Sequence, residues 1–429
     1  MKIVDFRSGI DTAQVVAFAG ESGQQPRVEA TVANIVQDVR RRGDAALMEY
    51  SQQFDGFDLS TSSLRVSAEE IKRHTEAASA EMIEILRAAM RNVREFHTHQ
   101  VEESWEFSPG AGIRLGVRST PIAKVGLYIP GGKAAYPSSV LMNAIPAQVA
   151  GVQRIVVVTP PKVLEQNPLI AAALKLLNID EVYRVGGAQA IAALAYGTET
   201  IPRVDKIVGP GNQYVQSAKR LVYGDVDIDM IAGPSEVAII TDESCNPAWA
   251  AADLLAQAEH DEMARVWLIC WSSEVAVAVF NEVQSQLQSL ERSEIARAAI
   301  ENHSVAFIVE NENAAVELAN LLASEHVEVL MSDPDRVAEG IRNAGALFIG
   351  RYAPTVVGDY FAGPSHVLPT GRTARFFSPL GVPDFVKRTS LIRYSGRAIE
   401  RFGTMIEKFA TEEGLTAHAR SIAIRRDQA

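Results

Sequence analysis

The spacing of hydrophobic residues divides the chain near residue 113. Over residues 27–100, apolar side chains recur every three or four positions, as they do from Val28 to Val39. That interval predicts amphipathic helices with one buried face. A further helix is predicted to begin at the capping box SAEE, residues 67–70. A long helix then ends near His97 and His99, which we interpret as a solvated helix end and not as a metal-binding pair.

From residue 113 onward, short apolar runs alternate with stretches of helical periodicity. Such alternation predicts a mainly parallel sheet with right-handed crossover connections. The predicted strands are 125–129, 155–159, 182–185, 206–208, 237–241, 266–271, 306–309, 328–331 and 346–349. After Pro379 the alternation stops, and a strand at 389–394 and helices follow. This tail has little core of its own, so we expect it to pack on another domain or another subunit.

Glycine-rich turns stand at several of the predicted strand ends. They are GPGN at 209–212, GPSE at 233–236 and PGGK at 130–133. Turns of this kind at strand ends are where open α/β sheets bind ligands, although ordinary βα connections have the same composition. None of the three matches a Walker motif or the G-x-G-x-x-G fingerprint of dinucleotide-binding proteins.

Size, charge and cysteine content narrow the class of protein. A chain of 429 residues exceeds what one hydrophobic core usually serves, so two or more domains are expected. A net charge of −12 without a basic stripe disfavours nucleic-acid binding. No signal peptide and no membrane-spanning apolar run are expected from the sequence. Cys245 and Cys270 have no metal or disulfide spacing, which suits a reducing cytoplasm.

Polar residues that suit catalysis concentrate after residue 250. Gln257 and His260 lie three apart on a predicted helix and share a face that is able to hold one side of a metal. Glu325 and His326 precede a strand and are a candidate general-base pair. Further candidates are Asp359 and His366 in a segment rich in glycine and proline, and Glu413 and His418 in the tail. For each histidine taken singly, a structural role is the alternative.

Several of these residues stand in motifs that occur in one order. The motifs are the signature at 206–242 with GPGN and DMIAGPSE, QAEH at 257–260, SEH at 324–326, GDYFAGPSHVLPT at 358–370 and EGLTAH at 413–418. With them the chain resembles the histidinol dehydrogenase family over nearly its full length. The resemblance implies oxidation of L-histidinol to L-histidine through L-histidinal, with two NAD+ reduced, as the last step of histidine biosynthesis.

The resemblance also implies a role for individual residues. It implies one Zn²⁺ per subunit held by Gln257, His260, Asp359 and His418, and a catalytic pair of Glu325 and His326. The implied substrate contacts are these six residues together with Ser235, His366 and Glu413. The implied NAD contacts are Tyr128, Gln189 and Asn212. His326 would take the alcohol proton, and Glu325 would activate the water that adds to the aldehyde.

The assembly implied by the resemblance is a homodimer whose C-terminal tail crosses to the partner subunit, and the cysteine usage noted above predicts a cytoplasmic location. Each chain would be an α/β protein with two incomplete Rossmann-like parallel-sheet domains. The expected divisions are an N-terminal helical region at 1–112, a first, NAD-side domain at 113–236, a second, zinc and catalytic domain at 237–378, and the tail at 379–429.

Three other functions are compatible with the same residues. A related NAD-dependent dehydrogenase would act on another amino alcohol. A zinc hydrolase would use Glu325 as the base for a metal-bound water. A non-catalytic two-lobed binding protein would need no acid-base pair. A covalent thiohemiacetal on cysteine is not expected, because Cys270 lies within an apolar strand and Cys245 lies in no motif.

Overall fold

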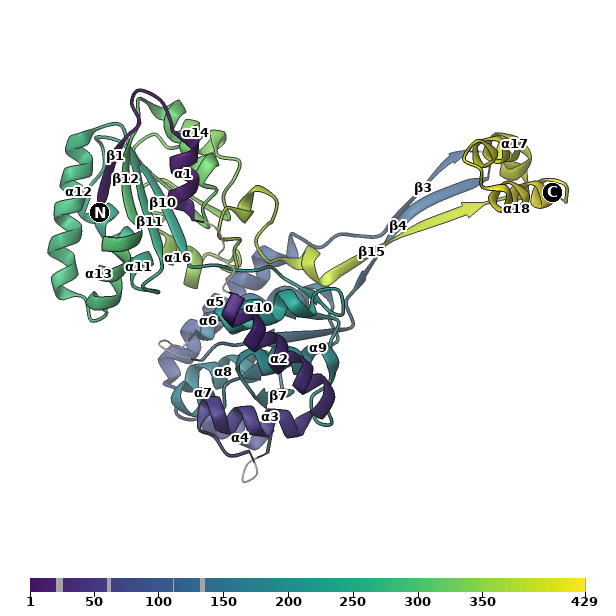
Figure 1. Ribbon diagram of the computed structural model, residues 1–429, viewed down its shortest axis with the longest axis horizontal. Coiled ribbons are helices and arrows are strands. Elements are labelled where there is room, and N and C mark those ends of the chain that lie inside the picture. Colours follow the sequence, from purple (N-terminus) through teal and green to yellow (C-terminus); the bar gives the residue numbers. More distant parts are fainter. Residues whose placement is uncertain (21–25, 60–62, 111, 132–135, 429) are drawn as a thin grey trace.

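The computed structural model describes residues 1–20, 26–59, 63–110, 112–131 and 136–428. Two α/β lobes lie side by side, and an arm extends from the first lobe away from both (Figure 1). Successive elements lie in different lobes at helices α1 (Thr12–Ala19) and α2 (Pro26–Arg42), at strands β9 (Asp227–Ile228) and β10 (Glu236–Thr241), and after helix α16 (Thr355–Tyr360).

The first lobe is built on a six-stranded sheet in the order β2-β7-β6-β5-β8-β9. Its other strands are β2 (Arg65–Val66), β5 (Lys124–Tyr128), β6 (Arg154–Thr159), β7 (Val182–Arg184) and β8 (Lys206–Val208). All pairs are parallel except that of β2 with β7. Val157 faces one hydrophobic cluster while Val156 and Val158 face the other. Both faces are therefore covered by helices, which is why these strands read as unbroken apolar runs.

A different set of helices covers each face of the first sheet. One cluster packs under α4 (Ala68–Thr75), α5 (Ala80–Thr98), α6 (Pro137–Ala150), α7 (Val163–Gln166) and α8 (Pro168–Leu176). The other packs under α2, α3 (Asp44–Tyr50), α9 (Gly187–Tyr196) and α10 (Gln213–Val222).

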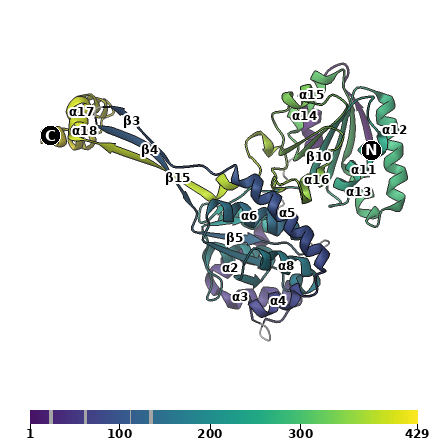
Figure 2. The same ribbon diagram turned by 180° about the vertical axis from the view of Figure 1, so that it is seen from behind.

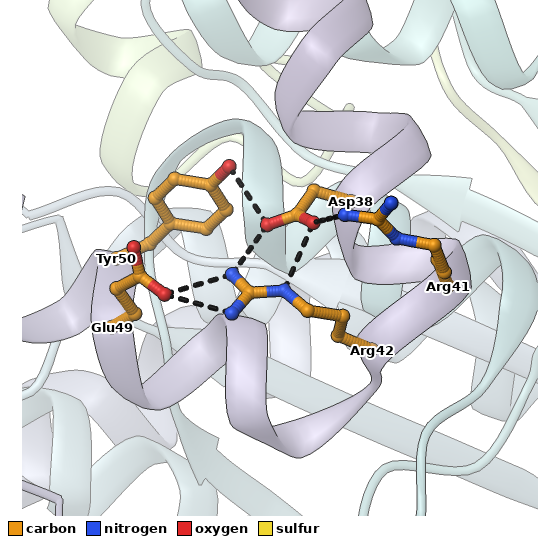
Figure 3. Close-up of polar contacts among 5 residues, drawn as sticks. All are labelled: Asp38, Arg41, Arg42, Glu49 and Tyr50. Atoms are coloured by element: carbon orange, nitrogen blue, oxygen red, sulfur yellow. Dashed lines mark hydrogen bonds and ion pairs between the residues drawn. The ribbon is translucent and has the colours of Figure 1, made fainter.

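A polar cluster fixes the corner between α2 and α3 (Figure 3). Asp38 accepts hydrogen bonds from Arg41 at 2.9 Å and from Tyr50 at 3.2 Å. Arg42 bridges Asp38 to Glu49, with its Nη1 2.8 Å from Glu49 Oε2. The Arg42 guanidinium lowers the pKa of Asp38 to about 2, so this carboxylate stays charged throughout the physiological range. The cluster ties the last turn of α2 to the last turn of α3.

The second lobe has a six-stranded, all-parallel sheet in the order β1-β12-β11-β10-β13-β14. Its other strands are β1 (Lys2–Asp5), β11 (Arg265–Cys270), β12 (Ser304–Ile308), β13 (His326–Leu330) and β14 (Ala346–Ile349). Its covering helices are α1, α14 (Glu312–Leu322) and α15 (Asp335–Gly340) on one face, and α11 (Pro247–Ala258), α12 (Ser273–Gln286) and α13 (Ser293–His303) on the other.

The arm is a three-stranded antiparallel sheet that ends in two helices. The strands β3 (Trp105–Gly110), β4 (Ile113–Pro121) and β15 (Val386–Tyr394) pair in the order β15-β4-β3. Helices α17 (Gly396–Glu412) and α18 (Thr416–Arg426) pack on each other at the far end, and both views show them apart from the lobes (Figure 2). Within the described part of the chain, no helix is both long and apolar enough to span a membrane.

The predicted α/β class with two parallel-sheet domains and a helical tail is confirmed. The predicted divisions need three corrections. Residues 1–112 are not a separate helical region, because β1 is an edge strand of the second sheet, paired with β12. Residues 113–121 form β4 of the arm, not part of the first lobe. The segment after Pro379 does not all leave the body, because Phe385 is fully buried in the first lobe.

The prediction for the end of helix α5 was half right. His99 is exposed, as a solvated helix end would be. His97, in contrast, is fully buried, and its Nδ1 donates a hydrogen bond to the Val93 carbonyl oxygen at 2.8 Å. Of the PGGK turn, Gly132 and Lys133 lie outside the described residues.

Candidate active site

A cavity of about 890 Å³ lies between the two lobes. The first lobe contributes the turn after β8, at the carboxyl end of its sheet. The second lobe contributes residues at the start of β10, β11 and β13, at the amino end of its sheet. Of the candidate residues, the cavity wall includes Asn212, Ser235, Gln257, His260, Glu325, His326, Asp359 and His366.

The main chain of Glu236 holds both members of the predicted catalytic pair. Its N–H donates to Glu325 Oε2 at 2.9 Å, and its carbonyl oxygen lies 3.0 Å from His326 Nδ1. Since a carbonyl oxygen only accepts, Nδ1 of His326 must carry the ring proton. The imidazole Nε2 is then an acceptor, and it is buried without a hydrogen-bond partner. The geometry therefore provides a base atom at the wall of the cavity.

Burial sets the charge of the same two side chains. It lowers the pKa of His326 to about 4, so the imidazole is neutral at physiological pH. The 3.6 Å separation of His326 Nδ1 and Glu325 Oε2 is therefore not a charged pair. Burial, reinforced by the carboxyl groups of Glu236 and Asp359, raises the pKa of Glu325 well above its usual range. The Glu325 carboxylate, once ionised, is a stronger base than an exposed glutamate.

Three of the four predicted metal ligands lie in the cavity wall. Gln257 is buried in the last turn of α11, His260 follows that helix, and Asp359 comes from α16. Burial lowers the pKa of His260, which keeps its imidazole neutral as metal binding requires. Burial also raises the pKa of Asp359 to about 6, and among the described residues no lysine or arginine forms an ion pair with this carboxyl group.

An amide oxygen, an imidazole and an uncompensated carboxylate suit a divalent metal of the zinc type. Among the described residues of one chain, no three His, Cys, Asp or Glu side chains gather as a metal site. The fourth predicted ligand, His418, is exposed on α18 at the end of the arm, as is Glu413 at the end of α17. The structure therefore does not bring these two residues to the cavity of their own chain.

His366 connects the two lobes at the cavity. Its Nδ1 donates to the main-chain oxygen of Asp359 at 3.0 Å, and its Nε2 lies 3.4 Å from the hydroxyl of Ser139 on α6. Burial lowers the pKa of His366 to about 4. A neutral imidazole held from both sides is suited to orienting a polar substrate.

The turn after β8 is fixed by a buried ion pair. Lys219 and Asp229 form the pair, and each side chain is 1% exposed. Lys219 Nζ also donates to the Gly209 carbonyl oxygen at 3.1 Å, while Asp229 accepts from the Gly209 N–H at 2.8 Å. Gly209 has a φ of +117°, and a Cβ there would collide with the Tyr128 carbonyl oxygen. Only glycine therefore fits at this position.

The three residues predicted to contact NAD occupy different environments. Asn212 lines the cavity and caps α10, accepting hydrogen bonds from the Tyr214 and Val215 N–H groups. Tyr128 is buried at the carboxyl end of β5, where its hydroxyl accepts from the Gly187 N–H at 3.2 Å. Gln189 is buried on α9 and, like Tyr128, is not part of the cavity wall.

Sequence reasoning missed the residues that hold the catalytic side chains and the cavity turn in place. Glu236 binds Arg265 at 3.0 Å in addition to holding the catalytic pair, and Lys219 and Asp229 hold the turn after β8. The sequence did carry one signal for these residues: each is a charged residue beside or within an apolar run that forms a buried strand or helix. Charged residues are almost always paired when they are buried, so such a position indicates a buried partner.

Two parallel-sheet lobes meeting at a cavity with a neutral imidazole, a buried carboxyl group and a set of metal-binding donors define a two-lobed α/β enzyme. Comparison with known proteins identifies its family. The family model "Histidinol dehydrogenase" matches residues 19–426. The chain belongs to the histidinol dehydrogenase family, whose members catalyse the final step of histidine biosynthesis.

Individual relatives match over almost their full length. The histidinol dehydrogenase of Geobacillus kaustophilus is 52% identical over 426 residues, 99% of each chain. That of Agrobacterium fabrum is 52% identical over 398 residues, 93% of this chain and 92% of that protein. The crystal structure of histidinol dehydrogenase from Elizabethkingia anophelis covers 100% of this chain and 98% of its own, at 34% identity and a TM-score of 0.93. The predicted family and the predicted enzyme class are confirmed.

Proposed function

We propose that this chain catalyses the zinc-dependent, NAD-linked oxidation of L-histidinol to L-histidine through L-histidinal. The observation that carries the proposal is the unpartnered Nε2 of His326, a neutral base beside the Glu325 carboxyl group in the cavity between the lobes. Membership of the histidinol dehydrogenase family supports L-histidinol as the substrate.

The metal-binding residues would be Gln257, His260 and Asp359 of one subunit, with His418 of a second. When bound, zinc would orient the substrate, and two molecules of NAD+ would in turn each accept one hydride. The first lobe offers Asn212 and the turn before it for the dinucleotide, and Tyr128 supports the neighbouring turn by accepting a hydrogen bond from Gly187.

The two oxidations place different demands on the catalytic pair. In the first, Nε2 of His326 takes the proton of the substrate hydroxyl, and the hydrogen bond from Nδ1 to Glu236 stabilises the resulting imidazolium. In the second, a water must add to the aldehyde before hydride leaves. The Glu325 carboxylate takes a proton of that water while the His326 imidazolium returns its proton to the aldehyde oxygen, and the neutral imidazole then removes a hydroxyl proton from the hydrate as the second hydride leaves.

The exposed apolar surface of the arm supports an exchanged-tail homodimer. Ile392, Met405 and Phe409 are 71%, 68% and 71% exposed in the single chain, and Trp105 and Phe107 are also exposed. Surface of this kind along a projecting element marks an interface. We propose that the arm of each subunit lies on the partner, which would bring His418 and Glu413 to the partner's cavity.

Mixed dimers test the exchanged tails. His418→Ala damages the arm alone and His260→Ala damages the body alone, so each homodimer should be inactive. Unfolding the two variants together and refolding them with zinc should give roughly half mixed dimers, in which one of two sites is whole. About a quarter of all sites should then recover. No recovery, while wild-type protein refolds under the same conditions, would contradict the exchange.

The activity itself is tested with purified protein, histidinol, NAD+ and zinc. Two equivalents of NADH should form for each histidine produced. NADH formed faster from another amino alcohol than from histidinol would identify a dehydrogenase of different specificity. A metal-dependent hydrolysis without any NADH would identify a hydrolase and overturn the proposal.

We also propose a cytoplasmic location, in line with two cysteines that are both free.

A further inference from the structure

A second pair of carboxyl groups lies behind the cavity, where the reaction described above does not use it. Glu328 is in the middle of β13, two residues after His326, and its side chain is 2% exposed. A buried carboxyl group in a central strand is costly unless its oxygen atoms have partners. The partners of Glu328 come from two other elements of the site.

The first partner is helix α16. Glu328 Oε1 accepts a hydrogen bond of 2.6 Å from the main-chain N–H of Thr355, the first residue of that helix. Asp359 lies four residues later, one turn along α16. The position of the Asp359 carboxyl group therefore depends on where Glu328 holds the start of the helix.

The second partner is helix α11. Glu328 shares a side-chain hydrogen bond with Asp253, which lies four residues before Gln257 and on the same face of α11. Two carboxyl groups form such a bond only when one of them carries a proton. Burial raises the pKa of Glu328 well above its usual range and that of Asp253 to about 6, so a shared proton is available at neutral pH.

We propose that Asp253 and Glu328 are positioning residues for the metal site: their shared hydrogen bond and the bond to Thr355 set the spacing between α11, which carries Gln257, and α16, which carries Asp359. The proposal rests on the proposed zinc-dependent function. An apolar pair of similar size would fill the same space without the cost of burying two carboxyl groups, but it would leave α11 and α16 without a polar connection.

Three variants separate positioning from packing. Glu328→Gln keeps an acceptor for Thr355 and supplies a permanent donor to Asp253, so it should bind zinc within about twofold of wild type. Glu328→Met fills the space and removes both bonds. It should weaken zinc binding by about 10–100-fold, as the loss of outer contacts to metal ligands typically does. Asp253→Ala, at a half-buried position, should also weaken zinc binding. This variant provides the test if Glu328→Met does not fold.

Zinc affinity is measured by competition with a chromogenic chelator, and the geometry by the visible absorption spectrum of the Co²⁺-substituted protein. KM for histidinol should rise more than kcat falls, because the metal orients the substrate. Thr241→Val is the matched control. Its hydroxyl is buried in the neighbouring strand β10 and donates to the Leu330 carbonyl oxygen at 2.7 Å, far along the strand from the metal ligands, so this variant should bind zinc as wild type does.

Wild-type zinc affinity and an unchanged Co²⁺ spectrum in folded Glu328→Met and Asp253→Ala would overturn the positioning role. If in the same experiment Gln257→Ala still loses zinc, the proposed metal site stands and only the inference about the carboxyl pair fails. Zinc affinity that is unaffected by Gln257→Ala as well would overturn both. Zinc binding weakened equally by Glu328→Gln and Glu328→Met would also refute the positioning role, because the former retains both hydrogen bonds.

Discussion

Replacing Lys219 by methionine should destabilise the first lobe far more than the loss of a surface charge would. The Lys219 ammonium and the Asp229 carboxylate are each 1% exposed, so water cannot replace the missing partner. Removing one member of a buried ion pair typically costs about 3–5 kcal/mol, because the other charge is left uncompensated. Here Asp229 keeps hydrogen bonds from the Gly209 and Met230 N–H groups, at 2.8 and 2.6 Å. We therefore expect the lower end of the range, about 3 kcal/mol.

The chain offers separate probes for the two lobes. None of its four tryptophans is in the first lobe, since Trp105 is in the arm and Trp249, Trp267 and Trp271 are in the second lobe. Urea unfolding followed by tryptophan fluorescence should therefore change little in Lys219→Met. Far-UV circular dichroism, which reports the helices of both lobes, should gain an earlier transition. The two transitions must be fitted separately, because a protein of several domains does not unfold in two states.

The double variant Lys219→Met/Asp229→Asn provides the control. It removes both charges, so much of the stability lost in the single variant should return. In both variants KM for NAD+ should rise more than kcat changes, since the pair holds the turn that precedes Asn212. A loss below about 1 kcal/mol in Lys219→Met, the range of an exposed ion pair, would refute the reasoning. So would a double variant that is less stable than the single one.

Three further predictions follow from the site and the core. His326→Ala should slow both oxidations, whereas Glu325→Gln should spare histidinol oxidation and slow histidinal oxidation by about 10²–10⁴-fold; equal slowing of both half-reactions would contradict these roles. Cys245→Ser and Cys270→Ser should retain turnover, because burial raises the pKa of both thiols and disfavours a reactive thiolate; inactive but folded variants would indicate covalent catalysis. Burial lowers the pKa of His97 below its ordinary 6.5, so folding favours the neutral ring. Its contribution to stability is complete above pH 6.5 and is lost as the pH falls towards the lowered pKa, and His97→Phe should show a flatter acid dependence of first-lobe unfolding by circular dichroism than wild type.

The sequence predicted the elements that can be recognised from the apolar pattern of their own residues. Strands such as β6 are apolar on both faces and bounded by turn residues, so their pattern alone identifies them. Strand β1 was missed because it has four residues, of which only Val4 is buried, and because its partner β12 lies roughly 300 positions later. Strands β3 and β4 were missed for a different reason: no residue of β3 is buried in the single chain, and in β4 only Ile113 and Gly116 are, so neither strand contributes a run of buried apolar residues.

The site was predictable to the extent that motifs carry it. The motifs supplied Gln257, His260 and His326, and the cavity brings these residues together. They did not supply the role of Glu236, because its contacts to the catalytic pair are made by main-chain atoms, which leave no trace in residue type. The buried position of His97 was also unpredictable, since the tail segment that includes Leu380 and Phe385 returns from far along the chain to pack in the first-lobe core.

The place of β1 in the second sheet has a consequence for how the protein is made. Strand β1, which is synthesised before either lobe, is the edge strand of the lobe that is completed late. Lys2 pairs with Val305, so at about 5–20 residues per second the strand waits roughly 15–60 s for its partner. Meanwhile nearly all of the first lobe, residues 26–230, has been synthesised and is free to fold as a unit. Strand β1 therefore remains unpaired during translation and is available to chaperones or to another nascent chain until β12 emerges.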